Sequence, residues 1–159
     1  MRISEQIFPR PVCLITTCDK EGRPNIMTAS FLMPISFNPK YIAFSIAPSR
    51  YSFKNLKEIK EFGLNVCSKE MKEAAWICGT RSGKSCDKFK EANLTPENSK
   101  VIKPPLVKES PISFECKVEF MKEFGDHFIV VGKVVREVIR KKKFKPLVHK
   151  SMDIFPEIQ

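Results

Sequence analysis

The chain has 159 residues, of which 42% are hydrophobic and 29% are charged, and its formal net charge is +10. This length is typical of one domain with a single core, and the composition excludes an intrinsically disordered chain. No apolar run approaches the roughly 20 residues that a membrane-spanning helix needs. The N-terminal residues lack the apolar core and the small-residue cleavage site of a secretory signal, so we expect a cytoplasmic protein with no membrane partner.

Most of the excess positive charge lies in one segment near the C-terminus. From Lys133 to Lys150 the chain has eight basic residues and one acidic residue, Glu137, which gives this segment a net charge of +7. A nucleic-acid-binding barrel is therefore one alternative. Such proteins usually interleave aromatic residues with the basic ones, and only Phe144 lies close to this run. We therefore interpret the segment as a solvated face or tail and do not expect a nucleic-acid partner.

The six cysteines form no C-x-x-C pair, which argues against a zinc ribbon or a thioredoxin-like site. Only two histidines, His127 and His149, are available as imidazole ligands. Because no export signal is present, we expect free thiols and no metal site. A catalytic pair of His127 with one of the cysteines is an alternative that no sequence feature favours.

The first part of the chain predicts three strands on short turns. Apolar and β-branched residues predict a strand over 12–18, and the hairpin turn after it includes Gly22, where a positive φ is expected. A second strand is expected over 25–35, and alternation predicts a third over 41–46. Short turns between successive strands indicate an antiparallel meander.

Helical spacing begins after the third strand. An apolar residue at every third or fourth position predicts a helix that opens near Ser52 and is capped by Gly63. A fourth strand over 63–67 follows. The same spacing predicts a second helix over 71–78, and we expect a short third helix over 87–92.

The last part of the chain predicts a long loop and two more strands. Four prolines from Leu94 to Pro111 leave no periodic pattern, and a loop of this length often serves as a lid or a binding loop. Alternation predicts a strand over 112–120 and a long final strand over 127–139, in which Gly132 marks a bulge or a close approach. Six strands with helices inserted before the fifth indicate a mainly β fold, a closed or split β-barrel.

One loop is similar to a phosphate-binding P-loop but does not match it. The segment from Gly79 to Ser85 has three residues between its glycines, where the motif needs four, and a helical pattern precedes it. A nucleotide triphosphatase is therefore not expected. The loop, with Arg81 and Lys84, can still offer hydrogen-bond donors to an anion.

A second candidate anion site lies where the third strand gives way to the first helix. The first N–H groups of a helix lack internal partners, and this end of the helix dipole is positive. The hydroxyls of Ser49 and Ser52 and the guanidinium of Arg50 would complete a phosphate cradle. The alternative is that Ser52 is only an N-cap and that Arg50 is solvated.

The strand from Asn25 to Phe31 has small and polar residues inside an otherwise apolar segment. Small side chains let a ligand approach the backbone, whose N–H and C=O groups then bind the edge of a planar heterocycle. The alternative is a half-exposed strand in which Thr28 and Ser30 face water.

Several short motifs occur in a fixed order along the chain. They are Pro9-Arg10-Pro11-Val12, Thr17-x-Asp19-x-x-Gly22, Asn25-x-Met27-Thr28-Ala29-Ser30-Phe31, Pro34-x-Ser36, Ser49-Arg50-Tyr51-Ser52, Cys78-Gly79-x-x-Ser82-Gly83-x-x-x-Asp87-Lys88-Phe89, Ser110-Pro111-x-x-x-Glu115-Cys116 and Gly125-Asp126-His127-x-x-x-x-Gly132-x-Val134. In this order they resemble the flavin reductase family, which has the FMN-binding split-barrel fold and includes flavoredoxins and archaeal ferric reductases. The resemblance covers about residues 9–138 of a single domain, 1–159, and leaves 139–159 as a basic C-terminal extension.

The resemblance implies a six-stranded, antiparallel, Greek-key split barrel that forms a homodimer with FMN held noncovalently at the interface. His127 would lie on the nicotinamide side as the catalytic residue, and its alternative role is that of a half-buried strand histidine. The resemblance places the cofactor against Asn25, Met27, Thr28, Ala29, Ser30, Ser45, Ile46, Ala47, Pro48, Ser49, Arg50, Tyr51, Ser52, Ser82, Gly83, Lys84 and Lys88.

The implied activity is that of an oxidoreductase, a flavin or ferric reductase or a flavoredoxin-type electron carrier. The flavin supplies the redox chemistry, and the protein binds and orients it. No G-x-G-x-x-G fingerprint is present, so NAD(P)H would bind loosely on the exposed face of the flavin. A redox partner protein is an alternative electron donor, and a ferric chelate is one acceptor. A flavin carrier or sensor without turnover is the alternative function.

Overall fold

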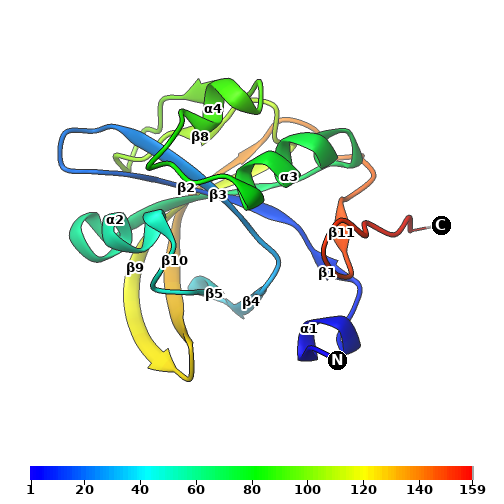
Figure 1. Ribbon diagram of the computed structural model, residues 1–159. Coiled ribbons are helices and arrows are strands. Elements are labelled where there is room, and N and C mark those ends of the chain that lie inside the picture. The colour runs from blue at the N-terminus through cyan, green and yellow to red at the C-terminus, as the bar shows by residue number, and fades with distance from the viewer. Residues whose placement is uncertain (159) are drawn as a thin grey trace.

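The computed structural model describes residues 1–158. Its centre is a seven-stranded sheet with the order β3-β2-β6-β9-β10-β5-β4, in which every neighbouring pair is antiparallel. Figure 1 shows that the β9–β10 hairpin runs across the direction of β2 and β3, so the sheet is strongly bent. The strands are β2 (Cys13–Cys18), β3 (Pro24–Ala29), β4 (Leu32–Phe37), β5 (Lys40–Ile46), β6 (Glu61–Val66), β9 (Ile112–Phe124) and β10 (His127–Ile139).

The predicted mainly β architecture with inserted helices is confirmed, but the sheet has seven strands, not six. The strand expected over 25–35 is interrupted at Ser30 and Phe31, so that β3 and β4 are separate. These two strands lie at opposite edges of the sheet, because β3 pairs with β2 and β4 pairs with β5. The bend between them is held where the Ser45 N–H donates to the Phe31 carbonyl at 2.8 Å.

The helices lie in the connections between strands. Helix α2 (Tyr51–Ile59) joins β5 to β6, and α3 (Lys72–Thr80) and α4 (Lys88–Glu91) lie between β6 and β9. Helix α1 (Ile3–Gln6) precedes the sheet, and a 3-10 turn, η1 (Lys69–Met71), precedes α3.

The prediction that Gly63 caps the first long helix is wrong. Helix α2 ends earlier, and Lys60, with a φ of 57°, takes the left-handed cap position while its N–H donates to the Leu56 carbonyl. Gly63 lies inside β6, where a Cβ atom would come within 2.3 Å of the Thr16 Oγ1 atom. The glycine is therefore needed for the close approach of neighbouring strands, not for the end of the helix.

The proline-containing segment from Leu94 to Pro111 is packed against the sheet. It contains a small sheet of β7 (Pro96–Glu97) and β8 (Leu106–Val107), and the side chains of Ile102, Leu106 and Val107 are buried. None of its residues lines the two cavities described below. The expected lid or binding loop is thus a structural element instead.

The core lies on both sides of the β2–β6 part of the sheet. On one side, Leu14 and Ile26 pack against Ala75 and Cys78 of α3. Inside the barrel, Phe44 and Phe62 meet edge to face with ring centroids 5.1 Å apart. A Cβ atom at Gly132 would lie 2.4 Å from the Phe62 ring, and the β9–β10 register shifts at this residue. The close approach predicted for Gly132 is confirmed.

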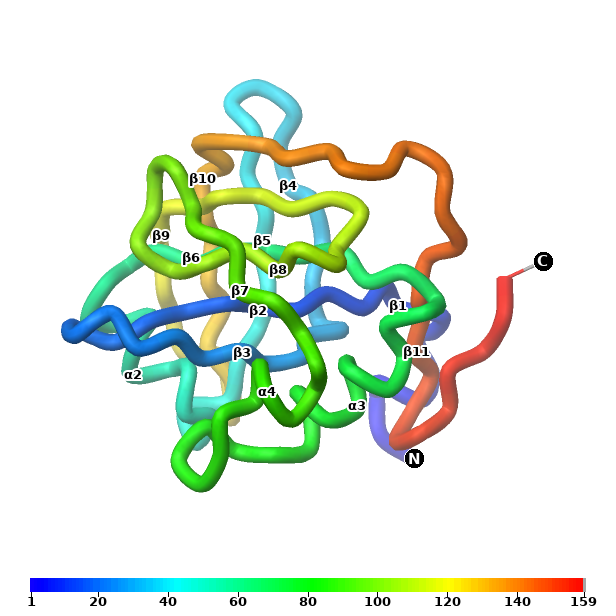
Figure 2. The backbone as a smooth tube through the Cα atoms, turned by 90° about the horizontal axis from the view of Figure 1, so that it is seen from above, coloured from blue at the N-terminus to red at the C-terminus, as the bar shows by residue number. Residues whose placement is uncertain are grey.

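The two ends of the chain lie beside each other. Strand β1 (Arg10–Pro11) pairs with β11 (Val148–His149), and Figure 2 shows this pair with the C-terminal segment folded back over it. Two residues of the basic segment from Lys133 to Lys150 form ion pairs: Arg136 with Glu115, and Arg140 with Glu97.

The structure agrees with the expected state of the cysteines, all six of which are free. No helix among the described residues is both long enough and apolar enough to cross a membrane.

Glu115 anchors the proline-containing segment to the sheet. Its side chain has no exposed surface and accepts hydrogen bonds from the N–H groups of Lys100, Val101 and Ile102 and from Arg136 at 2.5 Å. Burial alone would raise the pKa of Glu115, but the hydrogen bonds from these N–H groups and from Arg136 outweigh it, and the pKa is lowered.

We expect Glu115→Gln to lower the free energy of unfolding by about 3 kcal/mol, because it breaks a buried ion pair. Since the folded-state pKa of Glu115 lies below its unfolded value, its stabilisation is complete above the unfolded pKa and is lost as the pH falls through the folded pKa. Urea unfolding between pH 7 and pH 3 measures both effects. The matched control is Glu137→Gln, whose exposed pair with Lys40 should contribute less than about 1 kcal/mol. Equal losses in both variants would contradict the prediction.

Candidate functional site

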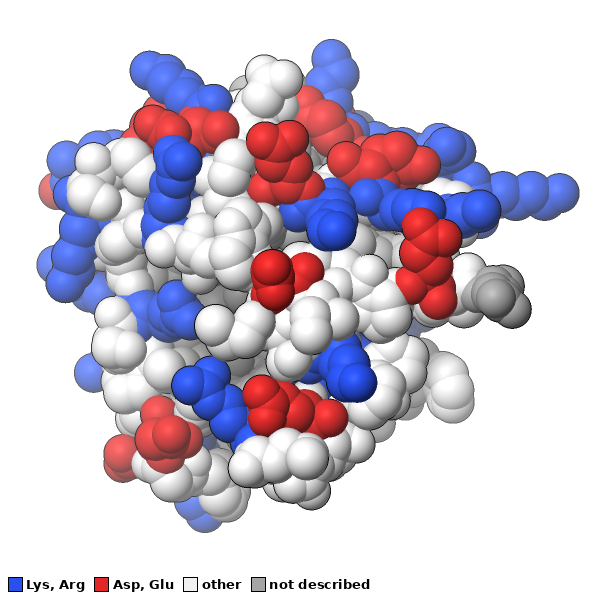
Figure 3. Space-filling model, turned by 45° about the vertical axis from the view of Figure 1, so that its right-hand side comes forward, with Lys and Arg blue, Asp and Glu red and all other residues white. Residues whose placement is uncertain are grey.

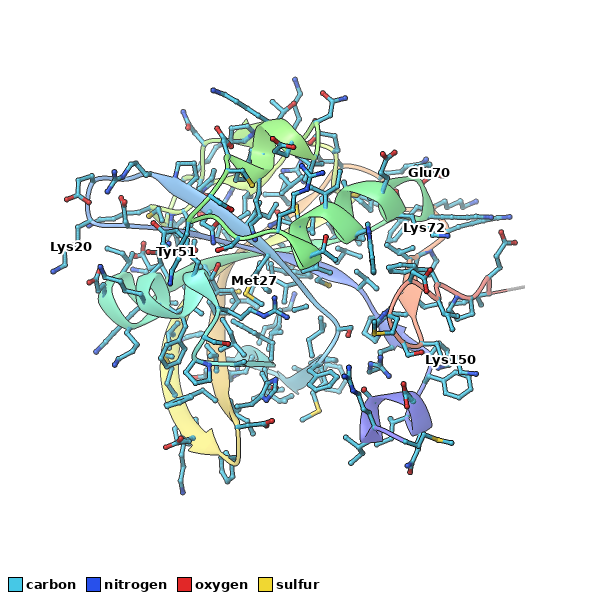
Figure 4. All side chains as sticks on the ribbon, viewed as in Figure 1. Lys20, Met27, Tyr51, Glu70, Lys72 and Lys150 are labelled. Atoms are coloured by element: carbon cyan, nitrogen blue, oxygen red, sulfur yellow. The ribbon has the colours of Figure 1, made fainter. Side chains whose placement is uncertain are left out.

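A cavity of about 300 Å³, here called the first cavity, opens between β3, the start of α2 and the end of α3. Met27 of β3 and Tyr51 of α2, labelled in Figure 4, mark its position. Its walls are formed by Asn25, Met27, Thr28, Ala47, Ser49, Arg50, Tyr51, Ser52, Cys78, Gly79, Arg81, Ser82, Lys88 and His127. The segments singled out in the sequence, 25–31, 45–52 and 79–88, therefore meet around one space.

Some of the expected cofactor residues do not line this cavity. Ala29 and Ile46 are buried in the core, and Ser45 is held in the β5–β10 register. Pro48 and Lys84 are exposed. The remaining two lie close to the first cavity. Ser30 lines a second cavity, described below, and Gly83 packs against Asn25 and Tyr51 in the wall of the first cavity.

The first cavity carries positive charge. Arg50, Arg81 and Lys88 line it, and no aspartate or glutamate does so within the described part of the chain. Arg81 is paired with Glu91, whereas Arg50 and Lys88 have no carboxylate within 4 Å among residues 1–158. An anion in the cavity would therefore meet two cations whose charge no neighbouring acid neutralises.

Lys88 is the more buried of these two cations. Its Nζ atom donates to the Cys78 carbonyl at 3.0 Å, and only 5% of the residue is exposed. Desolvation lowers the pKa of Lys88, and the nearby charge of Arg50 lowers it further. An anion beside Lys88 would replace part of the lost hydration and favour the ammonium form.

The start of α2 adds backbone donors to the same wall. Arg50 is the N-cap residue and Tyr51 the first helical residue, and no side chain caps the helix. The Phe53 N–H donates to the Arg50 carbonyl at 3.0 Å, and the N–H groups of Tyr51 and Ser52 before it are the ones that can bind an anion. Ser52 is not an N-cap, contrary to the alternative drawn from the sequence. Its hydroxyl instead accepts hydrogen bonds from Asn25 at 2.8 Å and Thr17 at 3.4 Å.

The loop after α3 packs tightly against this wall. A Cβ atom at Gly83 would lie 2.2 Å from the Asn25 Oδ1 atom and 2.8 Å from the Tyr51 ring. Only a residue without a side chain fits there. The segment from Gly79 to Ser85 begins in the last turn of α3, contrary to the expected loop, and Gly79, Arg81 and Ser82 form part of the cavity wall.

Sequence reasoning did not assign Cys78, Gly79 and Arg81 to the cofactor. Cys78 and Gly79 belong to a motif of the family resemblance, and Arg81 belongs to the segment that is similar to a P-loop. These two sequence features could therefore have indicated the three residues. Burial raises the pKa of Cys78 to about 11, although the charge of Lys88 opposes this shift. The thiol is therefore neutral at physiological pH.

His127 reaches the first cavity from β10. Its Nδ1 atom lies 2.7 Å from the Asp126 carboxylate, and its ring centroid lies 5.9 Å from that of Phe31. The hydrogen bond from His127 lowers the pKa of Asp126. The imidazole is partly exposed, so a second molecule can reach it from solvent.

A second cavity of about 200 Å³ adjoins the first and shares Thr28, Arg50 and Gly79 with it. The other residues of the second cavity are Val12, Ser30, Ala75, Trp76, Thr80, His149, Met152 and Phe155.

Comparison with known proteins shows the family and the fold of this chain. The family described as "Flavin reductase like domain" matches residues 4–156, so the chain belongs to that family. A relative is an uncharacterized protein of Pyrococcus abyssi, 36% identical over 121 residues that make up 76% of this chain and 69% of that protein.

Solved structures show the same fold. A protein assigned as a flavin reductase with a split-barrel domain, from Shewanella frigidimarina, is similar with a TM-score of 0.90 and 20% identity, over 99% of this chain and 86% of that chain. An FMN-binding protein from Thermus thermophilus has a TM-score of 0.85 and 19% identity, over 96% of this chain and 88% of that chain. The split-barrel fold expected from the sequence is confirmed.

We expect Ser52→Ala to lower the free energy of unfolding by about 1–3 kcal/mol, because it leaves the buried Asn25 amide without its acceptor. Ser49→Ala, on the exposed rim of the same cavity, is the matched control and should change stability by less than about 0.5 kcal/mol. Urea unfolding monitored by circular dichroism measures both. Similar losses in the two variants would show that the hydroxyl of Ser52 has no special structural role.

Proposed function

We propose that this protein binds FMN and passes electrons through it as an oxidoreductase of the flavin reductase type. The single observation that carries the proposal is the set of unneutralised cations in the first cavity, Arg50 and Lys88, beside the start of α2. Charged donors and free N–H groups at a helix start are the usual partners of a phosphate group. The FMN phosphate is therefore assigned to this cavity.

The flavin ring is assigned to the open edge of β3. The first cavity is at the lower end of the size range of small-molecule sites, about 300–1,000 Å³, so a cofactor bound there extends beyond it. Along β3 and at Ser30 just after it, the backbone groups among Thr28, Ala29 and Ser30 that face away from β2 are available to the polar edge of the ring, because β3 is an edge strand and has only β2 as a neighbour. Negative charge that develops on that edge during reduction would be stabilised by N–H donors.

A homodimer is part of the proposal. Phe31, Met33, Ile35 and Phe37, on β4 and the bend before it, are all exposed, and Phe37 is 95% exposed. Beside them lies an almost entirely apolar groove of about 350 Å³ that is lined mainly by β4, β5 and β6. Exposed apolar surface of this kind marks an interaction site, and a second copy of the chain would cover it.

FMN supplies the hydride and electron chemistry when it is bound. The chain's own residues bind and orient FMN and leave one side of it open to an electron donor. His127 is a ring-nitrogen donor or acceptor at the mouth of the first cavity, suited to hold the amide of a nicotinamide in place. We therefore propose NAD(P)H as the donor, with a redox partner protein as the alternative donor and a ferric chelate or free flavin as the acceptor.

The purified protein is expected to bind FMN, with a visible absorption spectrum typical of a flavoprotein. Arg50→Ala should weaken the binding of FMN by about tenfold or more, because charged hydrogen bonds contribute about 1.5–3 kcal/mol, and should leave riboflavin affinity almost unchanged. Quenching of flavin fluorescence measures both affinities. The control, Lys54→Ala, removes an exposed cation of the same helix that does not line the cavity. Equal losses for FMN and riboflavin would remove the phosphate role from Arg50.

Steady-state oxidation of NADH and NADPH by the FMN-loaded protein tests the enzymatic part of the proposal. His127→Ala should raise KM or lower kcat by about tenfold and leave FMN bound, because the residue orients the donor and not the cofactor. Asp126→Asn, which keeps a hydrogen-bonding partner for the imidazole, should have a smaller effect. FMN binding without any NAD(P)H oxidation would favour the flavin carrier or sensor.

A further inference from the structure

A third cavity, of about 310 Å³, lies where the basic segment from Lys133 to Lys150 passes the start of α3. Three lysines line it, Lys69, Lys72 and Lys145, together with apolar side chains that include Phe144 and Phe155. Among the described residues, the third cavity shares Phe155 with the second cavity and none with the first. Part of the basic segment, which the proposed function does not use, therefore forms the wall of a separate hollow.

Backbone hydrogen bonds hold the two sides of the third cavity together. The Lys69 N–H donates to the Lys145 carbonyl at 2.8 Å, and the Leu147 N–H donates to the Cys67 carbonyl at 2.9 Å. Lys69 and Lys72 lie on η1 and α3, whereas Lys145 comes much later in the chain, just before β11. The fold therefore brings these lysines to one place, and backbone contacts fix their relative position.

The third cavity has an excess of positive charge. Over residues 1–158, Glu157 is the one acidic residue that lines it, against three lysines. Lys72 and Lys145 have no carboxylate within 4 Å in this part of the chain. Residues 141–143, all lysines and all exposed, extend the charge along the basic segment. Figure 3, which brings this side of the molecule forward, shows many lysine and arginine side chains with acidic ones between them.

The last described residues of the chain already place a carboxylate in this cavity. Glu157 forms an ion pair with Lys69, and the Glu157 side chain is 72% exposed. The hydrogen bond from Lys69, helped by the charges of the other two lysines, lowers the pKa of Glu157. Lys72, labelled in Figure 4, lies with its Nζ atom 5.5 Å from the ring centroid of Phe155. An ion pair this exposed is weak, so a carboxylate from another molecule can displace Glu157.

We propose that the third cavity is a docking site for an acidic segment of a partner protein, whose carboxylates displace Glu157 and pair with the three lysines. A protein segment is favoured because the present occupant is itself a short peptide, and because the walls are apolar as well as cationic. Clusters of basic side chains are a recurring means of binding acidic peptide motifs. Since Phe155 also lines the second cavity, a docked partner lies beside the flavin site. That relation to the flavin rests on the proposed function, whereas the docking does not.

The first test measures the binding of a fluorescein-labelled hexaglutamate peptide by fluorescence anisotropy, with a hexaglutamine peptide that carries the same label as the uncharged control. At low ionic strength the hexaglutamate peptide should bind at least about tenfold more tightly, and its affinity should fall as salt screens the charges. Equal binding of the two peptides would overturn the proposal. Tighter binding of a six-nucleotide single-stranded DNA than of hexaglutamate would also overturn it, and would assign the surface to a nucleic acid.

The second test distinguishes this cavity from a generally positive surface. Glu157→Gln removes the competing carboxylate and should tighten the binding of hexaglutamate by about threefold, as expected for an exposed ion pair. The matched control is Glu123→Gln on β9, which makes the same change in net charge at an exposed residue outside the third cavity and should leave the affinity unchanged. Equal tightening in both variants, or no tightening in Glu157→Gln, would contradict the proposal.

A pair of double variants tests the lysines. Lys72→Ala with Lys145→Ala should weaken hexaglutamate binding by about fivefold or more, because two charges are removed from the cavity. The control is Lys117→Ala with Lys122→Ala, which removes two exposed charges on β9 outside the cavity. Equal weakening in both double variants would refute the site. FMN binding, measured in parallel, should be unchanged in all variants. If the protein binds no FMN, the proposed function fails, while the peptide titrations still test the docking site.

Discussion

The electrostatic relation between Arg50 and Lys88 determines how the first cavity works. Two cations that face one space repel each other, and burial of Lys88 makes its charged form harder to maintain. Neither is neutralised by a carboxylate among the described residues, so part of the folding free energy is used to hold them together. An anion removes this repulsion on binding. The charges of the site therefore favour an anionic ligand, and the rest of the fold keeps the walls of the cavity in place.

The walls come mainly from β3 and from two connections that the sheet order brings to it. Helix α2 follows β5 and α3 follows β6, yet both contact β3 at the far edge of the sheet. The contact is polar beside α2, where Asn25 donates to Ser52, and includes a hydrogen bond beside α3, where the Thr28 hydroxyl donates to the Ala75 carbonyl at 2.5 Å. The small and polar residues of β3 are explained by these contacts as well as by ligand access. Thr28 in particular does not simply face water.

Local patterns predicted most of the strands because each pattern depends only on residues within one segment. Alternation indicated the later strands, and a run of apolar and β-branched residues indicated β2, all of whose residues are buried. The break at Ser30 and Phe31 was not predicted, because it depends on long-range strand pairing. The residues before the break pair with β2 and the residues after it pair with β5, and a local sequence pattern does not show these partners. Gly63 was misassigned for a similar reason, since its requirement is set by Thr16 on a neighbouring strand. Local chemistry indicated the start of α2 and the 25–31 strand, and the family resemblance joined them to Ser82 and Lys88 in one site. Neither indicated Trp76 or the C-terminal segment, because only the pairing of β1 with β11 brings His149 near β3.

Arg50 connects the chemistry of the two cavities. Its guanidinium lines both, so an anion bound in one lowers the positive potential that an anion in the other experiences. An anion in the first cavity and an anion in the second would thus weaken each other's binding, because both would approach the same guanidinium. The effect is reciprocal by thermodynamic necessity and is reduced by salt, because Arg50 is exposed. The charge of Arg50 therefore couples the first cavity to the second cavity without any movement of the fold.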